Sequence, residues 1–318
     1  MEKENIVHLD NIDAYNKIYG IETKHPLVTV VDFDTVKSCA LPEDCTLCYG
    51  MYAIFLKQTF CGDITYGRQP YDYQEGTVVS FAPGQVVRVH RSKQVAEAVA
   101  AKPCVGLLFH PDLIRGTELG HDIRQYTFFS YDSREALHLS EEERGIFREC
   151  IHNIKTELNH SIDTHTKRLV CRNIQLLLDY CMRFYERQFI TRQNVNRDVL
   201  SHFERLLGEY FDNPENVRQG LPTVKYFAER CYLSPNYFGD LVKKETGHTP
   251  QEMIQKTIIG MAKDRLLGSD KSISEISYSL GFQYSQHFNR FFKRLTGHTP
   301  SEYRRVGGVE LPLNTMEK

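Results

Sequence analysis

The chain has 318 residues and lacks several features that would place it in a broad class of protein. It has no positive net charge, because 41 Asp and Glu outnumber 39 Lys and Arg, so nucleic acid could be bound only through a local basic patch. It has no apolar run near the roughly 20 residues that span a bilayer, and no N-terminal signal pattern. We therefore expect a cytoplasmic protein without a membrane partner, whose nine cysteines are reduced thiols.

Short runs rich in β-branched and aromatic residues fill the first third of the chain. They cover residues 26–36, 51–60, 77–90 and 104–110, and Gly, Pro and Asp bound them, as in a sandwich or barrel. The stretch "YDYQEGTVVSFAPGQV" places a Gly turn, a strand and a Pro-Gly turn in succession. This hairpin resembles the cupin-like barrel that serves as the sensor of many bacterial regulators.

Metal and redox sites have little support in this region. A metal-dependent cupin enzyme needs about three ligands, but Val86 and Val87 stand where His is expected, and His90 is interpreted as a surface residue. Cys45 and Cys48 form a CxxC that we interpret as a loop with two buried thiols. We predict no metal and no cofactor. Two alternatives stay open: a metal-dependent cupin enzyme with an accessory DNA-binding module, and a cysteine-based redox-responsive regulator.

A small-molecule effector would be bound by the β-rich part. Aromatic strand residues could line its pocket, although they are more often plain core, and two cations are candidate partners for an anionic effector. The candidates are Tyr52, Phe55, Lys57, Tyr66, Arg68, Tyr71, Tyr73 and Phe81.

The middle of the chain changes to a helical period. Ser140 and Glu143 predict a capping box, and an apolar stripe follows it. A second helix with a similar stripe is predicted after Asp163, which would be its N-cap, so the two helices form an antiparallel hairpin. Further apolar residues widen the surface beyond one seam and favour a homodimer. These residues are Ile146, Cys150, Leu176 and Leu178.

The pentapeptide TGHTP occurs twice, at 246–250 and at 296–300. Alignment of the two copies superposes apolar residues such as Phe238 and Phe288, and each copy reads as a short helix, a tight turn and a longer helix. Gly at 247 and 297 suits the left-handed end of the longer helix, and the following Thr-Pro-x-Glu begins another helix with a capping box. TGHTP therefore stops one helix and starts the next.

The segments "LSPNYFGDLVKKETGHTP" and "SISEISYSLGFQYSQHFNRFFKRLTGHTPSEYR" resemble the DNA-binding domain of the AraC/XylS family of bacterial transcription regulators. The resemblance implies an α+β multidomain protein: an N-terminal cupin-like β-barrel with a helical hairpin, then an all-α C-terminal domain of two helix-turn-helix motifs joined by a long helix. The implied boundaries are 1–136 for the sensor, 137–190 for the dimerisation helices, 191–197 for a linker, 198–306 for the DNA-binding domain and 307–318 for a tail.

The resemblance also implies a mechanism, in which the longer helix of each copy enters the major groove of double-stranded promoter DNA. The second copy has the richer face, and residues 280–306 carry five Lys and Arg against one Glu. The first copy presents Gly239 and Asp240 and would contribute less. A sequence-specific regulator of this kind implies an unknown effector and RNA polymerase as partners. The candidate DNA-binding residues are Asn236, Tyr237, Asp240, Lys243, Lys244, Ser285, Gln286, His287, Asn289, Arg290, Lys293 and Arg294.

Overall fold

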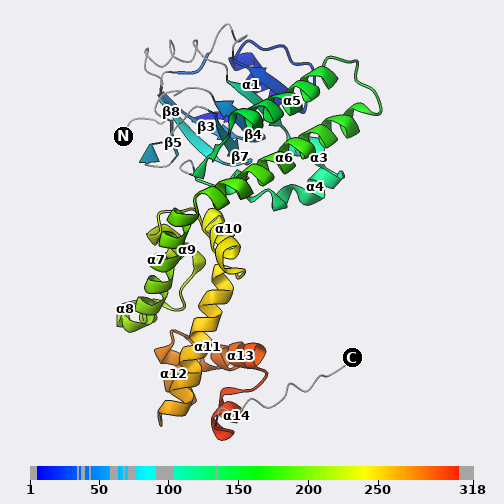
Figure 1. Cartoon of the computed structure of the whole chain (residues 1–318). Coiled ribbons are helices and arrows are strands. Elements are labelled where there is room, and N and C mark those ends of the chain that lie inside the picture. Colours follow the sequence, from blue (N-terminus) through cyan, green and yellow to red (C-terminus); the bar gives the residue numbers. More distant parts are fainter. Residues whose placement is uncertain are drawn as a thin grey trace. The chain divides into compact units, whose positions relative to one another are not determined.

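A computed structural model describes residues 6–33, 36, 40–42, 44–57, 64–66, 69–70, 76–90, 104–132 and 135–307. The chain divides into two compact units, residues 1–192 and 193–318 (Figure 1). In the part of the chain that the structure describes, no helix is long and apolar enough to cross a membrane.

The first unit contains two five-stranded sheets. One has the order β1-β3-β8-β5-β6 and consists of Ile6–Leu9, Asp44–Tyr49, Val86–His90, Ile64–Tyr66 and Gln69–Pro70. The other has the order β10-β7-β4-β9-β2 and consists of Leu137–His138, Thr77–Phe81, Tyr52–Lys57, Val105–Phe109 and Val28–Asp32. The four predicted β regions are confirmed, whereas β1 and β3 were not predicted as strands.

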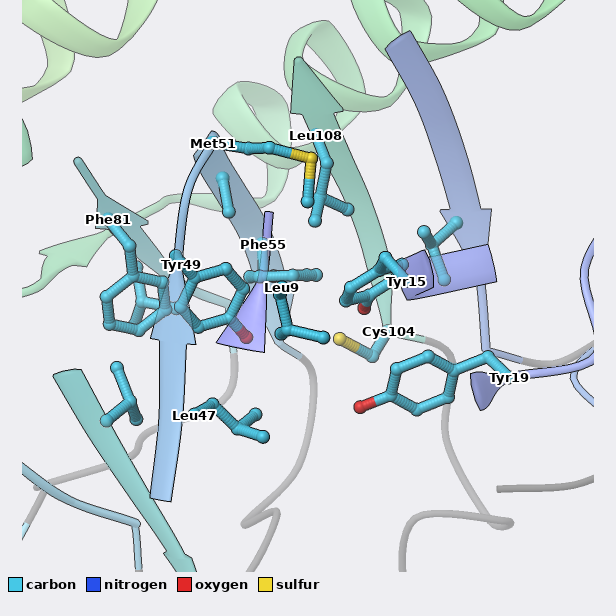
Figure 2. Close-up of a cluster of buried hydrophobic side chains, with 14 of the residues drawn as sticks. Leu9, Tyr15, Tyr19, Leu47, Tyr49, Met51, Phe55, Phe81, Cys104 and Leu108 are labelled. Atoms are coloured by element: carbon cyan, nitrogen blue, oxygen red, sulfur yellow. The ribbon is translucent and has the colours of Figure 1, made fainter. Parts of the chain in front are cut away.

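A core of apolar side chains joins the two sheets of this unit. Leu47 and Val87 come from one sheet and Phe55 and Val79 from the other, and all are buried. A short helix, α1 (Ile12–Ile18), adds the fully buried Tyr15 to the same cluster (Figure 2). Because alternate residues of a strand point to opposite faces, each sheet contributes every second side chain to this layer.

Two helices, α5 (Glu141–Glu157) and α6 (Thr166–Thr191), run side by side along the first unit (Figure 1). The predicted capping box of Ser140 and Glu143 is present. The predicted N-cap of α6 is wrong by two residues, because the N-cap is His165 and not Asp163. Asp163 lies just before it, and its carboxylate accepts hydrogen bonds from the backbone amides of His165 and Thr166. Short helices α3 (Pro111–Ile114) and α4 (Glu118–Asp122) and the 3₁₀ turns η1 (Ile123–Gln125) and η2 (Thr127–Ser130) precede this hairpin.

The surface argument for a dimer needs a correction. Cys150 and Leu178 are buried inside the unit, so neither residue can lie on an exposed face, and Ile146 is only partly exposed. Leu176 remains exposed, and Leu169, seven residues earlier on α6, is exposed beside it. The exposed apolar surface of α6 is therefore smaller than the sequence suggests. The apolar residues that repeat every seven positions along α6 are buried against α5 and the sheet.

In the second unit, residues 193–307 are described and form helices joined by short turns. Its elements are α7 (Gln193–Asp212), α8 (Pro214–Gln219), α9 (Val224–Arg230), α10 (Pro235–Thr246), α11 (Pro250–Gly268), α12 (Ile273–Ser279), α13 (Ser285–Thr296) and α14 (Pro300–Arg305). Phe203 of α7 makes edge contacts to Phe227 of α9 and Phe238 of α10, each with ring centroids 5.1 Å apart. This aromatic cluster holds α7 against the first helix pair.

The predicted linker at 191–197 is wrong in its local structure. Helix α7 begins at Gln193, not at Asp198, and Arg192 alone separates it from α6. Asn196 is buried and donates from Nδ2 to Oε1 of Glu245 at 3.3 Å, so a polar contact takes the place of an apolar stripe. Apolar periodicity does not predict this first part of α7, because the hydrogen bond of Asn196 is made to a residue 49 positions away in the sequence.

Candidate DNA-binding interface

The first repeat is a pair of capped helices. Thr223 caps α9 and Ser234 caps α10, each by accepting a hydrogen bond from a backbone amide three residues on. Gly247 ends α10 in the left-handed conformation with φ 74°. Thr249 and Glu252 then form the capping box of α11, and the hydrogen bonds from Thr249 lower the pKa of the Glu252 carboxyl. The predicted role of TGHTP as stop and start is confirmed here.

The second repeat reproduces this pattern with one change. Ser272 and Glu275 form a capping box for α12, Gly297 ends α13 at φ 80°, and α14 begins with a capping box at Thr299. Residue 284, however, is a tyrosine whose side chain accepts no capping hydrogen bond, where the first repeat has Ser234. The turn before it passes through Gly281 at φ 90°, a conformation that favours glycine.

Shared positions of the two repeats are the buried ones. Phe238 and Phe288 are fully buried, as are Val242 and Phe292 at the end of the same face. Phe288 contacts Phe282 of the turn with ring centroids 5.3 Å apart. The apolar faces that the sequence predicts therefore anchor α10 and α13, and the opposite faces of both helices are left on the surface.

The exposed face of α13 carries the strongest candidate residues. Gln286, Asn289 and Arg290 are all exposed, and their spacing of three and four residues places them on one side of the helix. Lys293 and Arg294 extend this face toward the C-terminal end and are exposed as well. Gln and Asn can pair with adenine and Arg with guanine, while the two later cations suit phosphates. His287 is also exposed, and Ser285 is partly exposed.

Helix α10 has a poorer surface, and one predicted residue is wrong. Asn236, Lys243 and Lys244 are exposed and Asp240 is partly exposed. Tyr237, in contrast, is 4% exposed, so its ring belongs to the core and not to a binding face. The apolar face of α10 is wide enough to include this tyrosine, whereas the corresponding His287 of α13 stays on the surface.

The long helix α11 separates the two repeats. Its 19 residues span about 28 Å at a rise of about 1.5 Å per residue, near the ~34 Å between successive major grooves. Ile254, Ile258 and Ala262 are buried along one side. Ile258 therefore contributes to packing, and the separation of the two repeats is compatible with adjacent grooves.

Sequence reasoning missed two features of the α13 surface. Tyr284 is 61% exposed and its ring packs edge-on against His287 with centroids 5.4 Å apart, at the start of the exposed face. A tyrosine at an N-cap position, where a short polar residue is usual, was the sequence signal that could have pointed to Tyr284. Arg304, one of the five cations counted from sequence, donates to the backbone carbonyls of Leu266 and Lys271 at 2.9 and 2.7 Å, so its guanidinium is committed to packing.

Among the predicted effector residues whose side chains are described, Phe55 and Phe81 lie together and Tyr52 lies apart from them. Tyr52 stacks on Phe109 with centroids 5.0 Å apart, whereas Phe55 lies in the core with Phe81, on the other face of β4. Lys57 is buried at the end of β4. The side chain of Tyr66 lies outside the described side chains, and Arg68, Tyr71 and Tyr73 lie outside the described residues.

The CxxC segment is a strand, not a loop. Cys45 and Cys48 both lie on β3. Residues three apart on a strand point to opposite faces, and their Cα atoms are about 10 Å apart, which is too far for a disulfide. Cys45 is in the core. In the described part of the chain, no three His, Cys, Asp or Glu side chains are grouped so that they could hold a metal ion.

Comparison with known proteins agrees with the geometry of the second unit. A family model described as a helix-turn-helix domain matches residues 227–306. The HTH-type transcriptional regulator YijO of Escherichia coli is 28% identical over 146 residues, 42% of this chain and 51% of YijO. The transcriptional activator and DNA repair enzyme AdaA of Bacillus subtilis is 32% identical over 114 residues, 36% of this chain and 53% of AdaA. The chain thus spans about half the length of these two relatives.

Among solved structures, a Chromobacterium violaceum transcriptional regulator described as AraC-type aligns with 36% of this chain and 95% of its own, at 20% identity and a TM-score of 0.31. The family match spans the end of α9 to α14 and therefore both reader candidates, α10 and α13. Together with the repeated residues quoted above, this match identifies the second unit as a helix-turn-helix domain of the AraC type.

Proposed function

We propose that the protein is a sequence-specific transcription regulator that binds double-stranded promoter DNA through α10 and α13. One observation carries the proposal: Gln286, Asn289 and Arg290 share an exposed helical face whose opposite side is fixed in an aromatic core. A rigid helix with base-reading side chains on its outer face is the arrangement that major-groove readers use. The names of YijO and AdaA, both transcriptional proteins, support the assignment.

The two reader helices would contribute unequally. α13 carries three polar base readers followed by two cations, whereas α10 offers Asn236, a partly exposed Asp240 and its two C-terminal lysines. Asp240 repels phosphate and could accept only from cytosine N4. We therefore assign most of the specificity to α13, with Tyr284 beside it as a further surface that can meet a base or its methyl group.

A binding measurement tests this assignment. Duplexes selected by the wild-type chain from a random-sequence pool give the preferred site, and fluorescence anisotropy gives affinities for that site and for scrambled DNA. Arg290→Ala should reduce the ratio of specific to nonspecific affinity by about 5- to 150-fold, the value of one bidentate base contact. Arg205→Ala, an exposed arginine on α7, is the matched control and should leave the ratio unchanged. Equal losses on both DNAs would contradict base readout by Arg290.

For the first unit we propose a cupin-like sensor that binds a small effector between its sheets. Tyr15, Tyr19, Tyr49 and Cys104 direct their polar tips toward a common region of the core (Figure 2). Burial raises the pKa of Tyr15 well above its ordinary value, and its neighbours Tyr19 and Tyr49 add to the rise. The Tyr15 phenol therefore stays neutral, and the group suits an effector with an apolar body and a hydrogen-bonding group.

The sensor proposal is tested with the full chain. A ligand of this chemistry should raise the melting temperature and change operator affinity, and Tyr49→Phe should weaken both effects. Tyr52→Phe is the control, because Tyr52 lies on the other face of β4 against Phe109. Equal effects of the two substitutions would place the ligand outside the inter-sheet region.

We also propose that the DNA-bound protein has RNA polymerase as a partner. The protein itself would form a homodimer through the exposed part of α6. Leu169 and Leu176 are two helical turns apart and are 42% and 45% exposed. Sedimentation should show a dimer that Leu176→Arg dissociates. A monomeric wild-type chain at micromolar concentration would refute the dimer.

A further inference from the structure

A close backbone contact connects the two repeats away from α11. The segment after α8 reaches the turn of the second repeat, where a Cβ atom added to Gly281 would lie 2.7 Å from the carbonyl oxygen of Gly220 and 3.4 Å from that of Val217. Gly220 and Gly281 are both buried, with φ of 116° and 90°. Glycine is therefore needed at 281 both for the turn and for the approach.

The carbonyl of Gly220 is held by α7, which packs on the first repeat. Tyr210, near the end of α7, donates its hydroxyl to the carbonyl oxygens of Gly220 and Asn216, both at 3.0 Å. The ring of Tyr210 packs edge-on against Tyr226 of α9, with centroids 5.0 Å apart. The core of the first repeat thus fixes the atom against which the second turn is seated.

A second tie joins α11 to the same end of the second repeat. Arg265 donates from Nη1 to the carbonyl oxygen and the hydroxyl of Ser279, at 2.8 and 2.7 Å. Burial lowers the pKa of Arg265, and the negative charge of Asp212 at the end of α7 opposes that effect. The second repeat is therefore attached at two separate points.

We propose that residues 210–220 act as a second strut beside α11 and fix the rotation of α13 relative to α10, with Gly220, Gly281 and Tyr210 as positioning residues. The inference rests on the proposed DNA binding. A body joined through one helix can swivel about its connection, whereas a second, separate attachment removes that freedom. The protein should then accept one spacing between its two half-sites, because one extra base pair shifts the second by about 3.4 Å and about 34°.

The test uses the full chain and the selected duplex, with zero, one or two base pairs inserted between the half-sites. Wild-type protein should lose about tenfold or more in affinity for one inserted pair, a loss comparable to mismatched contacts of one reader. Gly281→Ala should lower affinity for the original duplex and reduce the spacing penalty to under about threefold, because the second repeat can then rotate.

Two further variants separate positioning from strain. Gly247→Ala introduces the same kind of left-handed strain at φ 74°, but no atom lies within 4 Å of the added Cβ, so it should keep the wild-type spacing profile. Tyr210→Phe removes only the hydroxyl and should flatten the profile in the direction of Gly281→Ala, which decides the matter if Gly281→Ala does not fold. Identical spacing profiles for wild type and Tyr210→Phe would overturn the strut. A wild-type chain that selects no sequence would instead refute the proposed DNA binding.

Discussion

The salt dependence of DNA binding is the prediction that the exposed charges set most directly. Besides the base reader Arg290, four exposed cations lie on the reader helices: Lys243 and Lys244 on α10, and Lys293 and Arg294 on α13. If each of these four neutralises one phosphate, the plot of log affinity against log salt has a slope of about −3.6 per chain. Affinity should then fall by about 150-fold between 50 and 200 mM monovalent salt.

Removing the last two cations of α13 should change this slope by a calculable amount. Lys293→Gln combined with Arg294→Gln leaves two phosphate-binding cations, so the slope becomes about −1.8 and the same salt increase costs about 12-fold. Both side chains are exposed, so the fold should tolerate the change. Fluorescence anisotropy at four salt concentrations, with stoichiometry fixed by titration at high concentration, measures both slopes.

The control removes equal charge elsewhere in the same unit. Arg197→Gln with Arg205→Gln changes two exposed arginines on α7, and should keep the slope near the wild-type value. An unchanged slope in the α13 variant would refute the placement of phosphates along that helix. An equal fall in both variants would show that overall charge, not this face, determines the dependence.

Three predictions concern stability and are measured by urea unfolding of the full chain. Ser277→Ala should stabilise by about 1 kcal/mol, because the hydroxyl of Ser277 is fully buried without a hydrogen-bond partner in the described part of the chain, and Ala228 fills the equivalent position of the first repeat. At Tyr232, which has φ 59° and is 73% exposed, Gly should be about 1 kcal/mol more stable than Ala; equal stabilities would argue against strain there. Hydrogen bonds from Thr299 lower the pKa of Glu302, so its stabilisation is present above the ordinary pKa of about 4.3 and is lost as pH falls through the folded-state pKa. Wild type should therefore lose more stability than Glu302→Gln between pH 5 and pH 3, and parallel losses would contradict this.

The second unit was predictable because its signals are local. A cap, a proline at the first helical position and a glycine at the helix end act within four residues, so Thr249, Pro250 and Gly247 can be interpreted from the sequence alone. The repeat then supplied an internal comparison that the AraC resemblance extended. The failures in this unit, the start of α7 and the burial of Tyr237, depend on packing across α7, α9 and α10 that a one-dimensional pattern does not contain.

The first unit was less predictable because its arrangement depends on distant pairing. Strand β3 alternates over only a few residues, with Cys45, Leu47 and Tyr49 facing the core, and its place between β1 and β8 is set by partners such as Val87, 40 residues away from Leu47. Which face of β4 holds Tyr52 or Phe55 also follows from pairing, since a shift of one residue would exchange the two faces. Tyr52 was therefore assigned to one pocket with Phe55 and Phe81 although β4 separates it from them.

The differences between the two repeats give the duplication its functional meaning. Where the repeats agree, at Phe238 and Phe288 or at the two capping boxes, the residues are buried or end a helix. Where they differ, at Asp240 and Arg290, the residues lie on the outer face. One scaffold used twice with two different outer faces can bind two different half-sites, whereas two identical faces would require a direct repeat in the DNA. We therefore expect the selected duplexes to contain two different half-sites. A perfect direct repeat would show that α10 and α13 do not read the bases as assigned.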